Sequence, residues 1–158
     1  MNTEIRQASP SDSSSIAMLV IDLLSEIMTN TGDPHFRLDL VSIKERLEEW
    51  LLRDTYVAFV AVTPESEHVL GFITLCESYA LYAEGVIGTI PEFYVRPESR
   101  SQGVGRLLLD HSIVHARNKG WRRLEVTTPP LPVFEKTFRF YEHQGFSIAG
   151  GRKLKRLI

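Results

Sequence analysis

The sequence predicts an α/β (α+β) fold in a single domain over residues 1–158. Three observations support this prediction. The 158 residues, of which 43% are hydrophobic, suit one domain with a sizeable core. Strand-like and helix-like segments follow in the order β-α-α-β-β-β-α-β-α-β, without an internal repeat or an interdomain linker. A Gly-x-Gly sequence joins an apolar strand to an apolar helical run, which is how a chain builds a pocket for phosphate.

The N-terminal part predicts one strand and two helices. Residues 3–8 form a short candidate strand. Ser9 and Pro10 mark the start of a helix, because serine is a capping residue and proline fits the first helical turn. Apolar residues then recur at helical spacing until residues 29–34 break the pattern. The same spacing predicts a second helix at about 40–53.

The remainder predicts strands that alternate with two further helices. Strands are expected at about 55–63, 69–77, 86–95 and 123–128. A helix should follow the glycine sequence and end near Lys119, and another should occupy residues 134–144. The step from strand 86–95 through a helix to strand 123–128 predicts a right-handed crossover. The rest of the chain is expected to form one or two strands that run through Ile158.

The segment from Val95 to Leu109 carries the clearest chemical signal. Gly103 and Gly105 would let the backbone approach an anion closely. The first N–H groups of the following helix lack intrahelical acceptors, and the helix dipole adds positive potential there. Arg100 and Arg106 flank the loop with positive charge. On these residues alone, the alternative is a tight turn that only glycine fits.

This segment resembles the acetyl-CoA pyrophosphate loop of the GNAT family (GCN5-related N-acetyltransferases), which reads Arg/Gln-x-x-Gly-x-Gly/Ala. Arg100, Gly103 and Gly105 occupy those places. A second family element follows in the expected order, at Phe140-Tyr141-Glu142-His143-Gln144-Gly145-Phe146. The resemblance implies the GNAT fold, with a mixed, mainly antiparallel central sheet of six to seven strands and helices on both faces.

The resemblance also implies an activity. The chain would move an acetyl group from acetyl-CoA to a primary amine by direct attack in a ternary complex, without an acyl-enzyme. The residues expected to bind the cofactor are Phe93, Tyr94, Val95, Arg100, Ser101, Gln102, Gly103, Val104, Gly105 and Arg106. A different class remains open, namely a non-catalytic CoA-binding or interaction module with the same fold.

Two residues are candidates for catalysis. Glu92 lies on the strand that enters the loop and would take the proton of the amine, often through water in the family. Pro91 predicts a bulge at this point, because proline cannot donate to a sheet ladder. Tyr141 would donate a proton to the departing sulfur. The alternatives are a solvated strand carboxylate at Glu92 and a packed aromatic ring at Tyr141. Phe134 stands where many relatives carry an asparagine, so the cofactor arm has a different neighbour there.

The acceptor site is less well defined. His35 lies in the break between the first two helices, together with Asp33, in a region that often forms one wall of this site in the family. Tyr79, Tyr82 and Glu84 precede the cofactor strand and would suit an amine, since rings and a carboxylate attract ammonium. An ordinary exposed hairpin is the alternative reading of these three residues.

Composition argues against other classes of function. The net charge of −2 gives no general reason to expect nucleic acid, although residues 152–156 are locally basic. His111 and His115 have metal-binding spacing but lack a third ligand, so no metal is expected. The single cysteine, Cys76, allows no intrachain disulfide. Without a membrane-length apolar run or signal peptide, we expect a cytoplasmic protein that acts on a small-molecule or peptide amine. A homodimer stays open.

Overall fold

In the computed structural model, which describes residues 2–34 and 36–158, the chain forms two compact units. The first unit extends to Thr127 and the second covers Thr128–Ile158. The first unit holds the sheet and three of the α-helices named below, and the second unit holds the fourth. Along residues 2–34 and 36–158, no helix has the length and apolar character that a membrane crossing needs.

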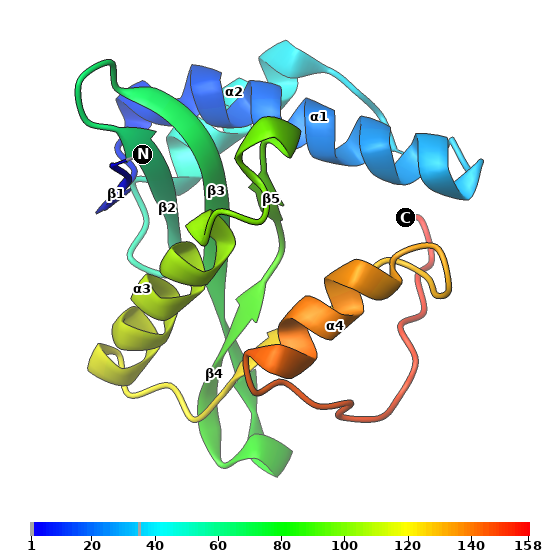
Figure 1. The fold of residues 1–158 in the computed structure, drawn as a ribbon. Helices are drawn as coiled ribbons and strands as arrows, with labels where there is room; N and C mark the ends of the chain where they lie inside the picture. The colour runs from blue at the N-terminus through cyan, green and yellow to red at the C-terminus, as the bar shows by residue number, and fades with distance from the viewer. Residues whose placement is uncertain (1, 35) are drawn as a thin grey trace. The chain divides into compact units, whose positions relative to one another are not determined.

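A mixed sheet forms the centre of the first unit (Figure 1). Its six strands within the described residues are β1 (Glu4–Gln7), β2 (Tyr56–Thr63), β3 (His68–Ala80), β4 (Gly85–Ile90), β5 (Phe93–Val95) and β6 (Leu124–Val126). Their order is β1-β2-β3-β4-β6, and β5 pairs with β3. Only the β4–β6 pair is parallel, and the others are antiparallel. The prediction of a mixed, mainly antiparallel sheet is confirmed.

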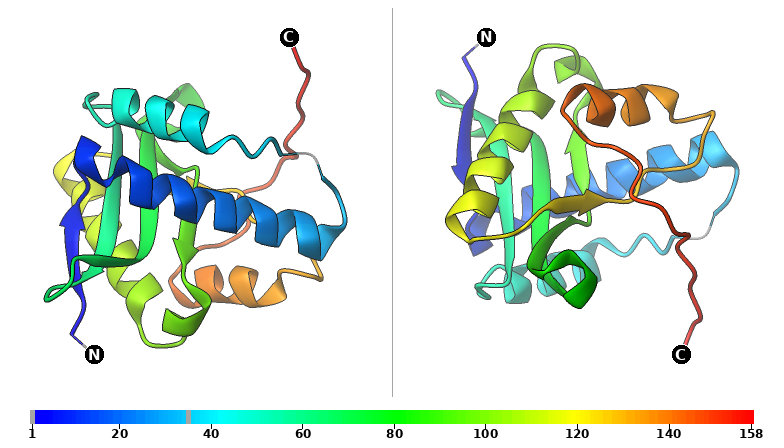
Figure 2. Two further views of the ribbon diagram at one scale, coloured as in Figure 1. Left: turned by 90° about the horizontal axis from the view of Figure 1, so that it is seen from above. Right: turned by 90° about the horizontal axis from the view of Figure 1, so that it is seen from below.

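Helices cover both faces of this sheet, as expected. The helices α1 (Ser13–Thr31) and α2 (Leu40–Trp50) lie on one face, and α3 (Val104–Asn118) lies on the other (Figure 2). Ile16 and Leu19 of α1 are fully buried against β2 and β3, and Leu108 and Leu109 of α3 are fully buried on the opposite side. Each helix therefore buries one apolar stripe against the sheet.

The predicted strand at 86–95 is interrupted by a β-bulge. Its two parts, β4 and β5, both pair with β3, but their register differs by one residue, because Thr89 pairs with Cys76 and Phe93 pairs with Ile73. The extra residue falls around Pro91, as the missing proline donor predicts. The parallel strand β6 pairs with β4, on the N-terminal side of the bulge. The bulge thus separates β4, which pairs with β3 and β6, from β5, which pairs with β3 and leads into the glycine loop (Figure 1).

The second unit contains α4 (Glu135–His143), which matches the predicted helix and ends before Gly145 at φ +90°. The prediction of one or two final strands is wrong, because residues 147–158 carry no secondary structure. Gly150 and Gly151 adopt left-handed φ angles of 89° and 78°, which are incompatible with an extended strand. Ile148 and Leu154 are exposed instead of facing a core.

Candidate functional site

Glu92 lies in the bulge between β4 and β5, and its backbone is fixed against β3. Its N–H donates to Thr74 Oγ1 at 3.0 Å, and its carbonyl accepts from the Thr74 N–H at 2.9 Å. Thr74 itself is 1% exposed. A buried hydroxyl needs a hydrogen-bond partner, and the N–H of Glu92 in the bulge is a partner for the Thr74 hydroxyl. The residue pair Glu92 and Thr74 therefore defines where the carboxylate can lie.

Two hydroxyl groups hold the Glu92 side chain by the same oxygen. The Thr74 hydroxyl donates to Glu92 Oε2, and the Tyr56 hydroxyl donates to it at 3.5 Å. No group among residues 2–34 and 36–158 donates to Oε1. The carboxylate is therefore oriented through one oxygen, and the lone pairs of the other are left to accept a proton or a water.

The surroundings of Glu92 favour its neutral form. Burial raises the pKa of Glu92, and the hydrogen bonds from Thr74 and Tyr56 partly oppose that rise. Burial and the Glu92 charge raise the pKa of Tyr56, which keeps this phenol protonated as a donor. Burial and the same charge also raise the pKa of Cys76, so the thiol stays neutral and is a poor nucleophile. A half-buried carboxylate with a raised pKa is suited to act as a general base near neutral pH.

Helix α2 supports this site from its C-terminal end. Trp50, the last residue of α2, packs edge-on against Tyr56 with ring centroids 5.3 Å apart. This contact fixes the ring whose hydroxyl reaches Glu92. Tyr56 and Thr74 were not among the predicted site residues. The only sequence signal for Thr74 is a single polar residue inside the apolar run of β3.

The glycine loop presents unpaired N–H groups where an anion would bind. Ser101 and Gly103 adopt left-handed φ angles of 60° and 85°, and α3 begins at the next residue, Val104. Leu107 is the first residue of this helix to donate back, to the Gly103 carbonyl at 3.0 Å. Within the described chain, no acceptor bonds the N–H groups of positions 103–106. This arrangement is a helix N-terminus open to an anion.

Arg100 connects the loop to helix α1. Its guanidinium donates to both carboxylate oxygens of Glu26 at 2.8 Å, and its Nε donates to the Val95 carbonyl at 2.9 Å. The same group lies over the Tyr94 ring at 5.2 Å. Arg106, on α3, is exposed and is 3.8 Å from Asp110. Arg100 therefore holds the loop in place, and Arg106 is the more accessible positive charge.

The short strand β5 leads from Glu92 to the loop, and its residues alternate in direction. The Glu92 carbonyl and the Arg96 N–H both bond to β3, at Thr74 and Leu70. Because neighbouring residues of a strand point their backbone groups to opposite sides, the groups of Phe93 and Val95 point away from β3. One continuous segment thus carries the candidate base, outward-pointing backbone groups and the glycine loop.

In the second unit, Tyr141 is 6% exposed and lies between two phenylalanine rings. The centroid of its ring is 5.4 Å from that of Phe140 and 5.3 Å from that of Phe146, both in edge-on contacts. The loop that ends α4 folds back, and the Phe146 N–H donates to the Tyr141 carbonyl at 3.0 Å. Burial raises the pKa of Tyr141, so its hydroxyl stays protonated and can serve as a proton donor.

The predicted acceptor residues 79, 82 and 84 lie together around the exposed tip of the β3–β4 hairpin. The Tyr79 hydroxyl donates to Glu77 at 3.1 Å, Tyr82 lies under the guanidinium of Arg123 at 5.4 Å, and Glu84 pairs with Arg122 at 3.2 Å. The carboxylates of Glu77 and Glu84 and one face of the Tyr82 ring are therefore already in contact with other side chains. Predicted residue His35 lies outside the described residues, so its place stays a prediction.

The two histidines of α3 contact groups of the protein itself. His111 Nδ1 lies 3.1 Å from the Leu107 carbonyl, and His115 packs edge-on against Phe59 and Trp121. The described part of the chain contains no group of three or more acidic, cysteine or histidine side chains that could hold a metal ion.

Comparisons with known proteins show which family and which folds the chain is similar to. The model of the Acetyltransferase (GNAT) family matches residues 20–146. A solved structure of a probable acetyltransferase is 26% identical, with a TM-score of 0.75 over 98% of this chain and 97% of that chain. A transcriptional regulator from Bacillus halodurans C-125 is 22% identical, with a TM-score of 0.78 over 99% of this chain and all 100% of its own.

A further structure with this fold is a ribosomal-protein-alanine N-acetyltransferase from Brucella melitensis biovar Abortus 2308. It is 16% identical, with a TM-score of 0.73 over 99% of this chain and 100% of that chain. Comparison with curated proteins gives no match.

The raised pKa of Glu92 predicts that replacing this residue stabilises the protein at neutral pH. The folded state binds the Glu92 proton more tightly than the unfolded state does, so wild-type stability falls as pH rises from the ordinary carboxyl pKa through the raised one. Glu92→Gln keeps an oxygen for Thr74 and Tyr56 but removes the charge. Its melting temperature should exceed that of the wild type at pH 7 by roughly a few degrees, and the gain should vanish near pH 4. A variant that is less stable than the wild type at pH 7 but matches it at pH 4 would show that the buried charge is favourable.

Proposed function

The chain belongs to the GNAT acetyltransferase family, and on that premise we propose that it is an acetyl-CoA-dependent N-acetyltransferase that acts on a primary amine. The observation that carries the proposal is the continuous segment from Glu92 to Arg106. It joins a half-buried carboxylate of raised pKa to four consecutive backbone N–H groups that have no acceptor in the described chain. Together these two features suit acyl transfer from a thioester on a phosphate-bearing carrier.

In this proposal the loop and β5 hold the cofactor. The N–H groups of residues 103–106 receive the pyrophosphate, and the helix dipole of α3 favours its negative charge. Arg106 adds an exposed cation. The outward backbone groups of β5, Val95 among them, would hold the pantetheine arm and polarise the thioester carbonyl, as in the family. Arg100 contributes indirectly, because its bonds to Glu26 and Val95 fix the loop.

The reaction then needs one proton acceptor and one proton donor. Glu92, oriented through Oε2, accepts the amine proton on Oε1, directly or through water. The amine nitrogen attacks the thioester carbon, the C–S bond breaks, and an amide forms. By the resemblance to the family, the hydroxyl of Tyr141, which burial keeps protonated, would give a proton to the departing sulfur. The products are the N-acetylated amine and CoA with a free thiol. Glu92 then loses its proton to solvent and the Tyr141 phenolate takes one up, which restores both groups.

The acceptor in this proposal is a small-molecule or peptide amine, and the protein works in the cytoplasm. One observation favours the alternative of a CoA-binding module without catalysis. A protein described as a transcriptional regulator shares this fold at a TM-score of 0.78, and fold alone does not imply an activity. Release of CoA thiol in the presence of an amine separates the two functions.

Gly105→Val tests the loop as the cofactor site. Gly105 lies inside α3 without a left-handed φ, so valine fits the backbone but crowds the N–H groups. Acetyl-CoA binding should weaken by about 1–3 kcal/mol, measured by calorimetry. Arg117→Ala, at the other end of α3, is the control and should bind as the wild type does. Unchanged affinity in a folded Gly105→Val protein would place the phosphates elsewhere.

Turnover tests the two proton-transfer residues. Glu92→Gln should lower the rate of CoA-thiol release about 10²–10⁴-fold, and the loss should shrink at high pH, where more of the amine is already neutral.

Tyr141→Phe should lower the rate of CoA-thiol release only about 10–100-fold, because a thiolate is a fair leaving group. A panel of primary amines serves as acceptors. If Glu92→Gln works at the wild-type rate, the base is another group; if no amine releases thiol from the wild-type protein, the non-catalytic function holds.

A further inference from the structure

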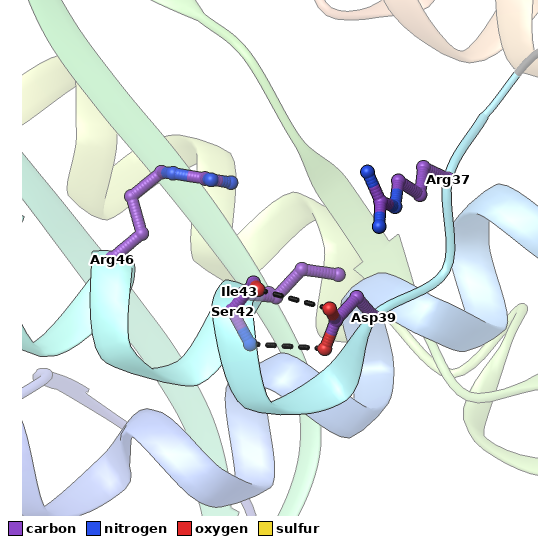
Figure 3. A pocket seen from close by; sticks show the side chains of 5 residues that line it. All are labelled: Arg37, Asp39, Ser42, Ile43 and Arg46. Carbon is purple, nitrogen blue, oxygen red and sulfur yellow. Dashed lines mark hydrogen bonds between the residues drawn. The ribbon is translucent and has the colours of Figure 1, made fainter.

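The mechanism leaves unused a hollow at the N-terminal end of α2, in the first unit (Figure 3). Its volume is about 320 Å³, which is within the range of small-molecule sites. The side chains that line it are Arg37, Asp39, Ser42, Ile43 and Arg46. Arg37 comes from the segment that joins α1 to α2, and the other cation comes from the second turn of α2. Two elements therefore direct positive charge into one space.

The carboxylate in this hollow is already engaged. Asp39 caps α2 and accepts from the Ser42 N–H at 3.2 Å and from the Ser42 hydroxyl at 3.0 Å. These bonds, with a smaller contribution from the Arg37 charge, hold the pKa of Asp39 below its usual range. The group is therefore ionised and oriented toward the helix. It offsets one positive charge of the hollow and leaves another uncompensated.

The two guanidinium groups extend toward the hollow from opposite sides (Figure 3). Neither Arg37 nor Arg46 forms an ion pair with a carboxylate of the described residues. Other arginines nearby are paired, since Arg53 contacts Glu49 at 2.6 Å. A guanidinium offers a planar fork of donors that fits a carboxylate or a phosphate by two parallel bonds. Two such forks facing one hollow suit an oxyanion.

One face of α2 connects this hollow to Glu92. Ile43, Arg46 and Trp50 follow one another at intervals of three and four residues, which places them on the same side of the helix. Arg46 and Trp50 are about 6 Å apart along the helix axis. Trp50 packs on Tyr56, whose hydroxyl reaches Glu92 Oε2. Two residues that line the hollow therefore lie on the same face of α2 as the ring that supports Tyr56.

We propose that this hollow binds an oxyanion of the acceptor, a carboxylate or a phosphate, through Arg37 and Arg46. The acceptor is thus an amine that carries an acidic group at its other end, and that group directs the amine along α2 toward Glu92. This inference rests on the proposed function and names its substrate class. It predicts that polyamines are not the preferred acceptors, because a second ammonium would enter a hollow with two guanidinium groups and a single carboxylate, Asp39.

The experiment compares acceptors of similar length that differ in the charge of their far end. The probes are 5-aminopentanoate, 4-aminobutylphosphonate, pentylamine and 1,5-diaminopentane, each assayed by CoA-thiol release from acetyl-CoA. At least one of the two acids should exceed pentylamine in kcat/KM by about tenfold or more. Arg37→Gln and Arg46→Gln should each remove most of that advantage, chiefly through KM, and leave pentylamine unchanged. Arg53→Gln, an arginine next to α2 that does not line the hollow, is the matched control and should change neither.

Preference for pentylamine or the diamine would overturn this inference, as would arginine variants that slow all acceptors equally. A second measurement separates it from the proposed function. If the wild-type protein releases no thiol with any amine, calorimetric titration with 5-aminopentanoate and 4-aminobutylphosphonate still tests the hollow. Binding of either that is lost in Arg46→Gln and kept in Arg53→Gln would support the anion site without catalysis. Absence of binding of both to the wild type would overturn it.

Discussion

The arrangement depends on one extra residue in one strand. Because Pro91 cannot donate to the ladder, β4 and β5 run along β3 out of register by a residue, and Glu92 falls inside the break. This shift directs the Glu92 backbone and carboxylate to Thr74. It also ends the pairing with β6, so β5 leads toward the glycine loop while it pairs with β3. A regular strand would move Glu92 to a different partner on β3 and would leave no break before the loop.

Two separate contacts connect this strand to the helices that cover it. The ion pair of Arg100 with Glu26 joins the glycine loop to α1, and the Trp50–Tyr56 ring contact joins the surroundings of Glu92 to α2. The phosphate end and the reacting end of the proposed cofactor site are thus positioned by different helices. The same α2 face that supports Tyr56 also lines the hollow of Arg37 and Arg46. Acceptor binding and the orientation of the base are therefore expected to be coupled through α2.

Local chemistry explains what the sequence predicted well. Glycine is favoured at the left-handed φ of Gly103, and Pro91 cannot donate to a ladder and so fits the break between β4 and β5. Both residues therefore indicate their local structure directly. The family and the mixed sheet were predicted from the glycine loop and the element at residues 140–146, which occur in the family's order. Tyr56 and Thr74 could not be identified in this way, because their contact with Glu92 depends on cross-strand register. That register is set by the bulge over a separation of many residues.

The errors and omissions have physical causes as well. The final segment was expected to form one or two strands through Ile158, but an apolar residue such as Leu154 makes a strand only where a partner strand and a core face receive it. Arg37 and Arg46 are both exposed, and a sequence cannot distinguish an arginine that lines a hollow from one that extends into bulk solvent. They line one hollow because Asp39 caps the start of α2, which sets how the segment with Arg37 joins the helix that carries Arg46.

The most direct test of this account is a titration of the Glu92 carboxyl group itself. Carbon-13 labelling of glutamate side chains allows the signal that is missing in Glu92→Gln to be followed by NMR as a function of pH. The account predicts that this signal titrates above the usual glutamate pKa of about 4.3, and that Thr74→Val moves the midpoint higher still, because the donor that favours the charged form is lost. A Glu92 signal with an ordinary midpoint that Thr74→Val leaves in place would contradict it, since the bulge would then hold no buried base.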